Sequence, residues 1–420
     1  MSAHADVLII GAGPAGLSAA LAAANDGAHV VLLDDNPLPG GQIWRDGVQA
    51  KIPAQARHLR DAVDNHASIQ RHADTRVVAR AGASALLVED AERGWVISYR
   101  ALILCTGARE LLLPFPGWTL PGVTGAGGLQ ALIKGGLPVA GERIVVAGSG
   151  PLLLASAGTA KHNGAQVVRI AEQAALGAVA AFALQLPRWP HKLLQSFSLF
   201  DPRYRSGTRI IAALGTDRLE GVRLQRGNSV EELECDRLAC GFGLIANVQL
   251  AQALGCALGN NAVQVDAWQA TSVSGIYAAG ECTGFGGSEL ALVEGCIAGH
   301  VAAGNRQAAQ RLWPGRRRWQ RFADALNKHF VLDPALKHLA EPDTLLCRCE
   351  DVPYAAVAAH TNWREAKLAT RCGMGACQGR ICGAATQYLF DWQPATPRPP
   401  FGPTRIDTLM QLEGSTQSGH

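Results

Sequence analysis

The sequence predicts an α/β protein with two copies of one strand–turn–helix–strand unit and a small cysteine-rich domain near the C-terminal end. Three observations support this fold class. The first unit occupies residues 7–35, a similar pattern recurs over residues 143–172, and five of the eleven cysteines fall between residues 347 and 382. At 420 residues the chain exceeds one ordinary core, so two or three domains are expected.

The first unit carries the residues of a dinucleotide site. An apolar strand over residues 7–10 runs into the turn Gly11-Ala12-Gly13-Pro14-Ala15-Gly16, an apolar helix follows, and a second strand ends at Asp34 and Asp35. Glycines let backbone N–H groups approach a pyrophosphate and let the helix pack close to its strand. An acid at the end of the second strand can accept the ribose hydroxyls. This order of elements predicts a bound dinucleotide.

The second unit repeats this pattern imperfectly. Its turn carries Gly148 and Gly150, and Glu172 follows the first glycine by 24 residues, the same distance as from Gly11 to Asp35. The equal spacing favours Asp35 over Asp34 as the ribose ligand. Leu153 stands where a third glycine belongs, and we expect it to push the helix outward and loosen the pyrophosphate seat. An NAD(H) site, a degenerate site or one for another nucleotide such as ATP, and a purely structural repeat all stay open.

Two further strands end in glycine turns. Residues 101–105 lead into Thr106-Gly107, and residues 275–279 lead into Gly280-Glu281. A glycine loop at 284–288 then opens a predicted helix whose N-terminal amides can face a cofactor. The second strand is expected to return to the first domain.

Composition and charge exclude several classes of function. The net charge of +3 gives no basic excess of the kind that nucleic-acid binding needs. The basic stretch 311–321 is interpreted as a solvated helix start, with an acidic partner or lipid head groups as the alternative. No leader-like segment and no apolar run of about 20 residues is present. We expect a cytoplasmic protein, and peripheral attachment at the inner membrane face stays open.

The cysteines fall into two groups. Six are scattered among apolar or glycine-rich residues and are expected to be small buried side chains, with no Cys-x-x-Cys pair: Cys105, Cys235, Cys240, Cys256, Cys282 and Cys296. The other five crowd around glycines, which let the backbone curl so that thiolates meet at one point: Cys347, Cys349, Cys372, Cys377 and Cys382. An iron–sulfur cluster is favoured over zinc or free thiols, and five candidates compete for four ligand positions.

Over residues 1–305 the order of these motifs resembles the flavoproteins with two dinucleotide-binding domains. The resemblance implies two Rossmann-like domains, the second inserted in the first, with FAD on the first domain and a nicotinamide nucleotide, when used, on the second. Carried over by motif, the FAD contacts are Gly11, Gly13, Pro14, Ala15, Gly16, Asp35 with Asp34 beside it, Gly40, Gly41, Gln42, Val77, Thr106, Gly107, Gly280, Glu281 and Leu290. The candidates in the second unit are Gly148, Gly150 and Glu172.

Residues 340–390 resemble the BFD-like [2Fe–2S] domain, and the whole chain is similar to the α subunits of bacterial amine-oxidising dehydrogenases. That group includes D-hydroxyproline dehydrogenase, opine oxidase, hydrogen cyanide synthase and heteromeric proline dehydrogenases. The resemblance implies that Cys347, Cys349, Cys377 and Cys382 are the cluster ligands, with Cys372 as the alternative. The expected domains are an FAD-binding domain (1–115 and 246–330), a second nucleotide-binding domain (116–245), a small helical iron–sulfur domain (331–392) and an extended or disordered tail (393–420).

The resemblance also implies a division of labour. An amine or imino acid, such as D-hydroxyproline, proline or an opine, is oxidised on a separate FAD-containing β subunit of the D-amino-acid-oxidase type. The present chain then transfers the electrons within a hetero-oligomer, for which an interfacial FMN and a small third subunit stay open. The sequence shows no catalytic base or nucleophile, because its histidines stand isolated: His72, His162, His191, His329, His338 and His360. The rival hypotheses are a self-sufficient NADH-dependent oxidoreductase and a nucleotide-binding scaffold.

Overall fold

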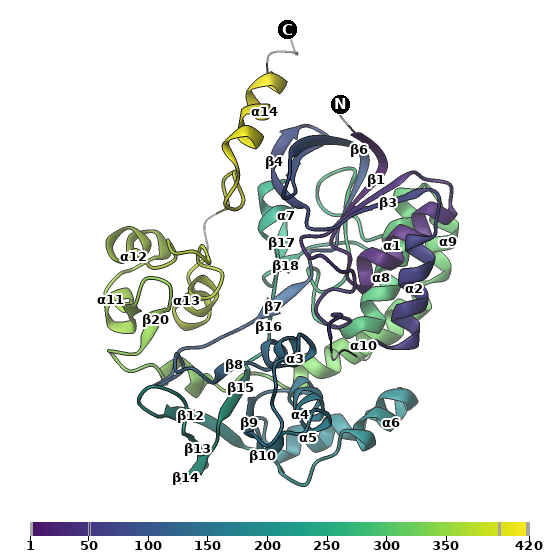
Figure 1. Cartoon of the computed structure of the whole chain (residues 1–420). Helices are drawn as coiled ribbons and strands as arrows, with labels where there is room; N and C mark the ends of the chain where they lie inside the picture. Colours follow the sequence, from purple (N-terminus) through teal and green to yellow (C-terminus); the bar gives the residue numbers. More distant parts are fainter. Residues whose placement is uncertain (1–2, 49, 51, 394–395, 417–420) are drawn as a thin grey trace. The chain divides into compact units, whose positions relative to one another are not determined.

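The computed structural model describes residues 3–48, 50, 52–393 and 396–416. The chain folds into two compact units (Figure 1). Unit 1 contains the described residues up to Arg109, then Ala246–Asp324, and the chain from Thr396 onward. Unit 2 contains Glu110–Ile245 and the described part of 325–395. The predicted α/β class with two Rossmann-type domains is confirmed, and the second domain interrupts the first in sequence.

Unit 1 is built on a seven-stranded sheet with the order β3-β2-β1-β6-β5-β4, in which β19 also pairs with β6. Strands β1, β2, β3, β6 and β19 run parallel, whereas β4, β5 and β6 form an antiparallel meander. Alternate side chains of β1 enter two separate cores: Val7 and Ile9 pack with α1 and α8, and Leu8 packs with α7. The strands are therefore covered on both faces, which explains their continuous apolar sequence.

The elements of unit 1 in chain order are β1 (Ala3–Ile10), α1 (Pro14–Asn25), β2 (Val30–Leu33), α2 (Ala54–Asp64), β3 (Ile69–His72), β4 (Arg76–Gly82), β5 (Ala85–Glu89), β6 (Gly94–Leu104), α7 (Gln249–Ala253), β17 (Leu258–Gly259), β18 (Ala262–Val263), β19 (Ile276–Ala278), α8 (Gly287–Ala302), α9 (Arg306–Arg311), α10 (Trp313–His329, whose end belongs to unit 2) and α14 (Ile406–Thr416). The short strands β7 (Ala108–Glu110) and β16 (Leu244–Ala246) pair where the chain leaves unit 1 and returns to it.

Unit 2 has a five-stranded parallel sheet with the order β11-β10-β9-β15-β8. Helices α3 and α4 cover one face of this sheet, where Leu129 and Leu153 lie in one core. A three-stranded antiparallel sheet of β12, β13 and β14 contributes to the core on the other face. Glu110 begins this unit, and its carboxylate accepts the N–H groups of Gly127 (2.7 Å) and Gly128 (2.8 Å) at the start of α3.

The elements of unit 2 in chain order are β8 (Val123–Gly125), α3 (Ala126–Lys134), β9 (Arg143–Gly148), α4 (Leu152–His162), β10 (Gln166–Glu172), α5 (Leu176–Ala183), η1 (Leu186–Arg188), α6 (Pro190–Ser198), β11 (Tyr204–Arg205), β12 (Thr208–Leu214), β13 (Gly221–Arg226), β14 (Ser229–Glu234), β15 (Arg237–Gly241), η2 (Pro334–His338), β20 (Leu345–Cys347), β21 (Val352–Pro353), α11 (Tyr354–Ala358), α12 (Trp363–Thr370) and α13 (Cys382–Phe390).

The C-terminal cysteine-rich segment packs onto the second nucleotide-binding fold. Leu336 and Ala384 lie in the same core as Phe115 and Phe242. The buried indole of Trp118 donates from Nε1 to the carbonyl of Leu345 at 2.6 Å. The segment predicted as a separate iron–sulfur domain therefore shares its hydrophobic core with the rest of unit 2.

The chain beyond residue 393 is not simply an extended or disordered tail, as the sequence suggested. Within its described part, α14 packs on the meander of unit 1, where Leu409 and Leu412 contact the core of Val78, Ala79 and Leu87. The prolines over 394–403 predicted extended chain, but the apolar spacing that follows them forms a helix with one buried face. Among the described residues, none of the helices is long and apolar enough to cross a bilayer.

We predict that Glu89 controls the docking of this tail. Its side chain, 1% exposed, accepts Arg76 Nη2 at 2.6 Å and the N–H of Arg405 at 3.0 Å. Burial alone raises the pKa of Glu89, but these hydrogen bonds outweigh it and hold the pKa below the ordinary value. A lowered pKa stabilises the folded state at neutral pH, and this contribution is lost as the pH falls through the folded-state pKa. Tail docking should therefore weaken in acid.

The Glu89→Gln variant tests this prediction at neutral pH. We expect tail docking to weaken by about 1–3 kcal/mol, because a buried charged hydrogen-bond acceptor is lost. Trypsin cleavage after Arg405 measures the exposure of the tail, and it should become several-fold faster. The exposed neighbour Glu92 provides the control Glu92→Gln, and equal cleavage rates for the two variants would contradict the prediction.

Candidate functional site

The first glycine turn has no room for a side chain at its first and third glycines. Gly11 adopts φ +105°, and a Cβ on it would lie 2.2 Å from the carbonyl oxygen of Cys105. A Cβ on Gly16 would lie 1.7 Å from the carbonyl oxygen of Gly11. Helix α1 starts at Pro14 directly after Gly13, so its first N–H groups lack intrahelical partners and are available to an anion. This turn fits the pyrophosphate of a dinucleotide.

The loop after β2 folds back on this turn. The N–H of Gly40 donates to the carbonyl of Ala12 at 2.7 Å, and Gly41, at φ +59°, packs on Gly13. Arg60 of α2 is 8% exposed, bonds the carbonyl of Trp44 and pairs with Asp46 at 3.0 Å. The predicted Gly40 and Gly41 thus lie at the turn, whereas Gln42 is exposed and accepts a hydrogen bond from Arg45.

The return strand β19 brings Gly280 to the first turn of α1. A Cβ on Gly280 would lie 2.8 Å from the Cβ of Ala15. The 3% exposed carboxylate of Glu294 accepts the N–H of Gly280 at 3.2 Å and pairs with Arg316 at 3.4 Å. Burial raises the pKa of Glu294 despite the neighbouring Arg316. This buried pair holds the Gly280 turn in place, and it assigns Arg316 of the basic stretch to a structural role.

The remaining predicted contacts of unit 1 lie near the ends of its strands. Thr106 Oγ1 donates to the carbonyl of Asn247 at 2.6 Å, and Gly107 follows at φ +64°. Leu290 is 4% exposed in the second turn of α8, and Val77 is partly buried in β4. Burial also raises the pKa of Glu281, which follows Gly280.

The strand registers align the two nucleotide-binding units differently from the residue count. Strands β1 and β2 pair without interruption up to Ile10 and Leu33, so Asp34 comes directly after β2, beside the glycine turn. In β10 a register shift between Val167 and Arg169 inserts one extra residue before Glu172. The spacing of 24 in the second unit therefore corresponds to 23 in the first, so the equal residue count does not favour Asp35 over Asp34.

The side chains of the two aspartates agree with this register. Asp34 is 7% exposed, and its carboxylate accepts the N–H of Ala12 within the turn and that of Asn36. Asp35 is exposed and accepts a hydrogen bond from the Asn36 amide at 2.9 Å. Asp34 is the structural counterpart of Glu172, whose carboxylate likewise accepts an N–H of its glycine turn, that of Gly150.

In the second unit, Leu153 does not simply push α4 outward as expected. Its side chain is fully buried, and it occupies the space that a side chain on Gly241 of β15 would need. A Cβ on Gly241 would lie 2.8 Å from Leu153 Cδ2. A glycine on the neighbouring strand thus compensates for the glycine that the helix lacks. Helix α4 nevertheless starts at Leu152, one residue later after its glycine turn than α1 does.

The second glycine turn is occupied by other parts of unit 2. Phe330, which follows α10, lies 3.9 Å from the position of a Cβ on Gly150, and its carbonyl accepts Ser149 Oγ at 3.4 Å. The N–H of Ser149 donates to the carbonyl of Gly241 at 2.7 Å, and that of Gly150 donates to Glu172. Glu172 is fully buried, and burial raises its pKa. The turn amides and the acid thus already bind one another.

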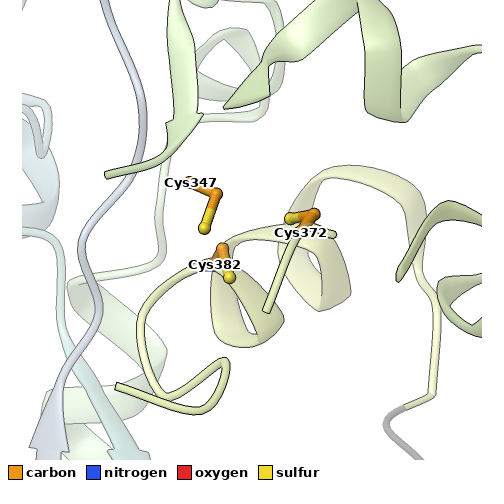
Figure 2. Close-up of side chains that lie close together, drawn as sticks. All are labelled: Cys347, Cys372 and Cys382. Atoms are coloured by element: carbon orange, nitrogen blue, oxygen red, sulfur yellow. The ribbon is translucent and has the colours of Figure 1, made fainter. Parts of the chain in front are cut away.

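Among the described residues, three of the five C-terminal cysteines gather at one point, and they include Cys372 but not the predicted ligands Cys349 and Cys377. The Sγ atoms of Cys347, Cys372 and Cys382 all lie within 4.8 Å of one another, and Figure 2 shows these three side chains gathered between β20 and the start of α13. The neighbouring Cys372 and burial raise the pKa of the Cys382 thiol. Cys349 and Cys377 are neighbours outside this group: the N–H of Cys377 favours ionisation of Cys349, but the Cys377 thiol and burial outweigh it and raise the pKa of Cys349.

Backbone conformation brings these thiols together. Arg371 and Gln378 adopt left-handed conformations, and Gly373 and Gly379 have φ +82° and φ +78°. Burial opposes ionisation of the Cys377 thiol, but the N–H groups of Ile381, Gly379 and Arg380 hydrogen-bond it and hold its pKa below the ordinary value. A set of soft thiol donors with N–H groups aimed at sulfur fits an iron–sulfur cluster or a zinc ion.

Sequence reasoning missed four residues that shape these sites: Arg60, Asn247, Glu294 and Phe330. Each acts through a long-range contact, and none belongs to a recognisable motif. It also missed the hydrogen bond between His300 Nδ1 and the Asp26 carboxylate (2.6 Å). Asp26 caps the C-terminal end of α1, a 12-residue helix, and so lies about 18 Å along the axis from the glycine turn. This pair joins α8 to α1 far from the turn.

Comparison with known proteins agrees with this geometry. The family model of the pyridine nucleotide-disulphide oxidoreductases matches residues 5–308. Hydrogen cyanide synthase subunit HcnB of Pseudomonas protegens is 32% identical over 89% of each chain, and the opine oxidase A subunit of Rhizobium meliloti is 32% identical over 97% of this chain and 98% of its own. L-proline dehydrogenase from P. horikoshii shares the fold, with a TM-score of 0.67 and 18% identity over 97% of this chain and 80% of that chain.

Both relatives are subunits of multi-subunit enzymes, and membership of the family implies a bound FAD. The similarity to both relatives extends through nearly the whole chain. The chain therefore belongs to the pyridine nucleotide-disulphide oxidoreductases, and it is an oxidoreductase similar to the subunits of hydrogen cyanide synthase and opine oxidase.

Proposed function

We propose that this chain is the electron-transferring subunit of a multimeric dehydrogenase in which an amine or imino acid is oxidised on a partner flavoprotein subunit. The observation that carries the proposal is the group of three buried thiols, Cys347, Cys372 and Cys382, in a chain that also has a complete dinucleotide turn. Iron–sulfur clusters supply one-electron transfer and flavins accept hydride, so the two together suit a relay. The relatives named as oxidase and synthase subunits support the same class.

We assign the FAD-binding site to the first glycine turn, the Gly40-Gly41 loop, Thr106-Gly107 and the Gly280 turn. Gly11, Gly13 and Gly16 let the backbone approach the pyrophosphate, and the start of α1 supplies N–H donors. Asp34 holds the ribose hydroxyls. We expect Leu290 and the N-terminus of α8 to face the ring.

The assignment of Asp34 gives a direct prediction. Asp34→Asn should weaken FAD binding about tenfold or more, because a charged acceptor for the ribose hydroxyls is lost. Asp35→Asn should leave FAD binding unchanged, since this side chain lies on the surface. Dialysis of the purified variants followed by flavin quantification measures the difference. Loss of FAD from the Asp35 variant alone would restore the assignment made from residue spacing.

For the [2Fe–2S] cluster, we assign Cys347, Cys349, Cys377 and Cys382 as ligands, with Cys372 as the alternative. The N–H groups aimed at Cys377 favour a thiolate there, whereas the neighbouring Cys372 and burial raise the pKa of Cys382. Glu350 is not a competing ligand, because its carboxylate is paired with Arg371 at 2.8 Å. Zinc remains the competitor for the same thiols.

The second nucleotide-binding unit does not support a self-sufficient NADH-dependent enzyme. Phe330 lies on its glycine turn, 3.9 Å from the position of a Cβ on Gly150, and the carbonyl of Phe330 accepts Ser149 Oγ at 3.4 Å. A dinucleotide would have to displace these contacts. We assign the unit a structural role, in which its shared core supports the cysteine group; ATP or FMN in the complex stays a prediction.

We place the protein in the cytoplasm, bound to a D-amino-acid-oxidase-type FAD subunit. Its eleven cysteines are all free thiols, as expected of a reducing compartment. A scaffold without redox function would also form such a complex, so cofactor content has to distinguish the two roles.

The test combines anaerobic titration with reconstitution. The purified chain is mixed with NADH, and flavin absorbance, iron and sulfide are measured; it is then co-expressed with the candidate partner, and dye reduction is followed with hydroxyproline, proline and opines. We expect bound flavin and iron, no flavin bleaching by NADH, and substrate-dependent dye reduction only in the complex. Prompt bleaching would establish the NADH-dependent alternative, and absence of flavin and iron would leave the scaffold.

A further inference from the structure

Residues 173–200 of unit 2 form a segment of unusual composition, which we call the basic-apolar segment. Between Glu172 and Asp201 the chain has no acidic residue over 28 positions, and its charged side chains are Arg188 and Lys192. The segment forms α5, η1 and α6 and lies between β10 and β11 of the parallel sheet. Such a stretch has one sign of charge and many large apolar side chains.

Helix α6 turns its apolar side away from the protein. Leu199, which follows the helix, packs on α4, where its Cδ2 lies 3.2 Å from the position of a Cβ on Gly158. Successive helical residues are about 100° apart, so Phe197 lies on nearly the opposite side from Leu199. Phe197 is 70% exposed and Leu194 is 69% exposed, and no residue of α6 is buried. An ordinary surface helix buries its apolar stripe.

Exposed large apolar side chains are concentrated in the whole segment, not in α6 alone. Of the fifteen large apolar side chains that are exposed in the described part of the chain, five lie within this segment: Leu176, Leu184, Leu194, Phe197 and Phe200. Large apolar patches of this kind mark interaction sites in soluble proteins.

The segment is nevertheless held firmly on unit 2. Trp189 is 2% exposed, and the ring of Phe182 packs edge-on against Phe330 at 5.2 Å. The first acid after the segment, Asp201, is 3% exposed and paired with Lys161 at 2.5 Å. Its negative charge is therefore neutralised inside the protein, and Asp201 adds no exposed acid at the end of the segment.

We propose that the basic-apolar segment attaches the protein to an anionic lipid surface. Leu194, Phe197 and Phe200 enter the boundary between head groups and acyl chains, and Arg188 and Lys192 reach the lipid phosphates. Interfacial helices combine a leucine- and phenylalanine-rich face with lysine and arginine, and each basic residue near an anionic leaflet adds attraction. The lack of any acid over 28 residues favours lipid phosphate over a protein surface of mixed charge. The inference does not rest on the proposed relay.

Co-sedimentation of the full-length FAD-bound protein with vesicles tests the proposal. One set contains phosphatidylcholine alone and the other also contains phosphatidylglycerol. We expect binding to the anionic vesicles only, decreasing at high salt. The double variant Leu194→Asp/Phe197→Asp should bind the anionic vesicles at least about tenfold more weakly than the wild type. Arg188→Gln should bind them about fivefold more weakly. Val230→Asp, at a 54% exposed site in β14, is the matched control and should bind as the wild type does.

Flavin content and thermal unfolding confirm that each variant is folded. Three results would overturn the proposal: no binding of the wild-type protein to anionic vesicles, equal binding to both vesicle types, or equal binding of the double aspartate variant. Two further results would show that the surface is a protein interface and that the lipid proposal is wrong. In one, the double variant fails to assemble with a co-expressed partner subunit; in the other, the wild type is a dimer without lipid and the double variant is a monomer.

Discussion

Replacing Cys349 by serine is expected to remove the iron and acid-labile sulfide from the protein while leaving FAD in place. Cys349 is exposed, so the substitution opens no cavity in the core. Its thiol neighbours that of Cys377, and we assign both as ligands. A serine oxygen is a harder ligand than a thiolate and holds an iron–sulfur cluster poorly. FAD is assigned to unit 1, which the substitution does not touch.

Metal, sulfide and flavin analyses of the same sample measure this effect. We expect iron and sulfide to fall to about a tenth or less of the wild-type content, because a direct ligand matters more than the outer-shell partners that cost 10–100-fold. Cys296→Ser, in α8 of unit 1, is the control and should keep both. Full iron and sulfide in the Cys349 variant would contradict the ligand assignment, and zinc without sulfide in the wild type would replace the cluster by a zinc site.

The same analysis decides between Cys372 and Cys382. We expect Cys372→Ser to keep its iron and Cys382→Ser to lose it. Both thiols lie within 4.8 Å of Cys347, so proximity alone does not rank them. The opposite result would make Cys372 the fourth ligand.

Much of the fold could be predicted from sequence because its signals are local. The strand, the glycine turn and the helix of each nucleotide-binding unit are contiguous in the chain, and close backbone contacts require glycine at Gly11, Gly16 and Gly148. The cysteine spacing predicted convergence for the same reason, since glycine and left-handed residues lie between the thiols.

The errors came from features that act across the sheet. One extra residue in β10 changed the spacing before Glu172, and only strand pairing reveals which residue is extra. Leu153 suggested a displaced helix because the compensating Gly241 is 88 residues away in the chain. Phe330 and the Glu294–Arg316 pair belong to segments with no motif of their own, and α14 becomes a stable helix through its contact with the meander. Long-range packing decides such positions, and local propensity does not reveal it.

Gly16→Ala is expected to abolish FAD retention and to destabilise unit 1. The added Cβ would lie 1.7 Å from the carbonyl oxygen of Gly11 and 2.9 Å from its carbonyl carbon. These are backbone atoms, so no change of rotamer relieves the overlap, and α1 has to move away from β1. We expect unfolding of the flavin-free protein to become easier by about 3 kcal/mol or more, at or above the upper end of ordinary overpacking. Thermal unfolding and the flavin-to-protein ratio measure the two effects.

Two alanine variants show whether the backbone contact is the cause. In the second unit, Gly241→Ala meets first the flexible Leu153 Cδ2 at 2.8 Å, so it should cost less, about 1–3 kcal/mol, and leave FAD bound. Gly402→Ala meets no atom within 4 Å and should change neither quantity. Normal flavin content in Gly16→Ala would show that α1 tolerates a wider separation from β1. In the second unit, Leu153 fits because a glycine, Gly241, lies opposite it. In the first unit the matching position at the end of the neighbouring strand is Cys105, so the turn depends on Gly16 itself.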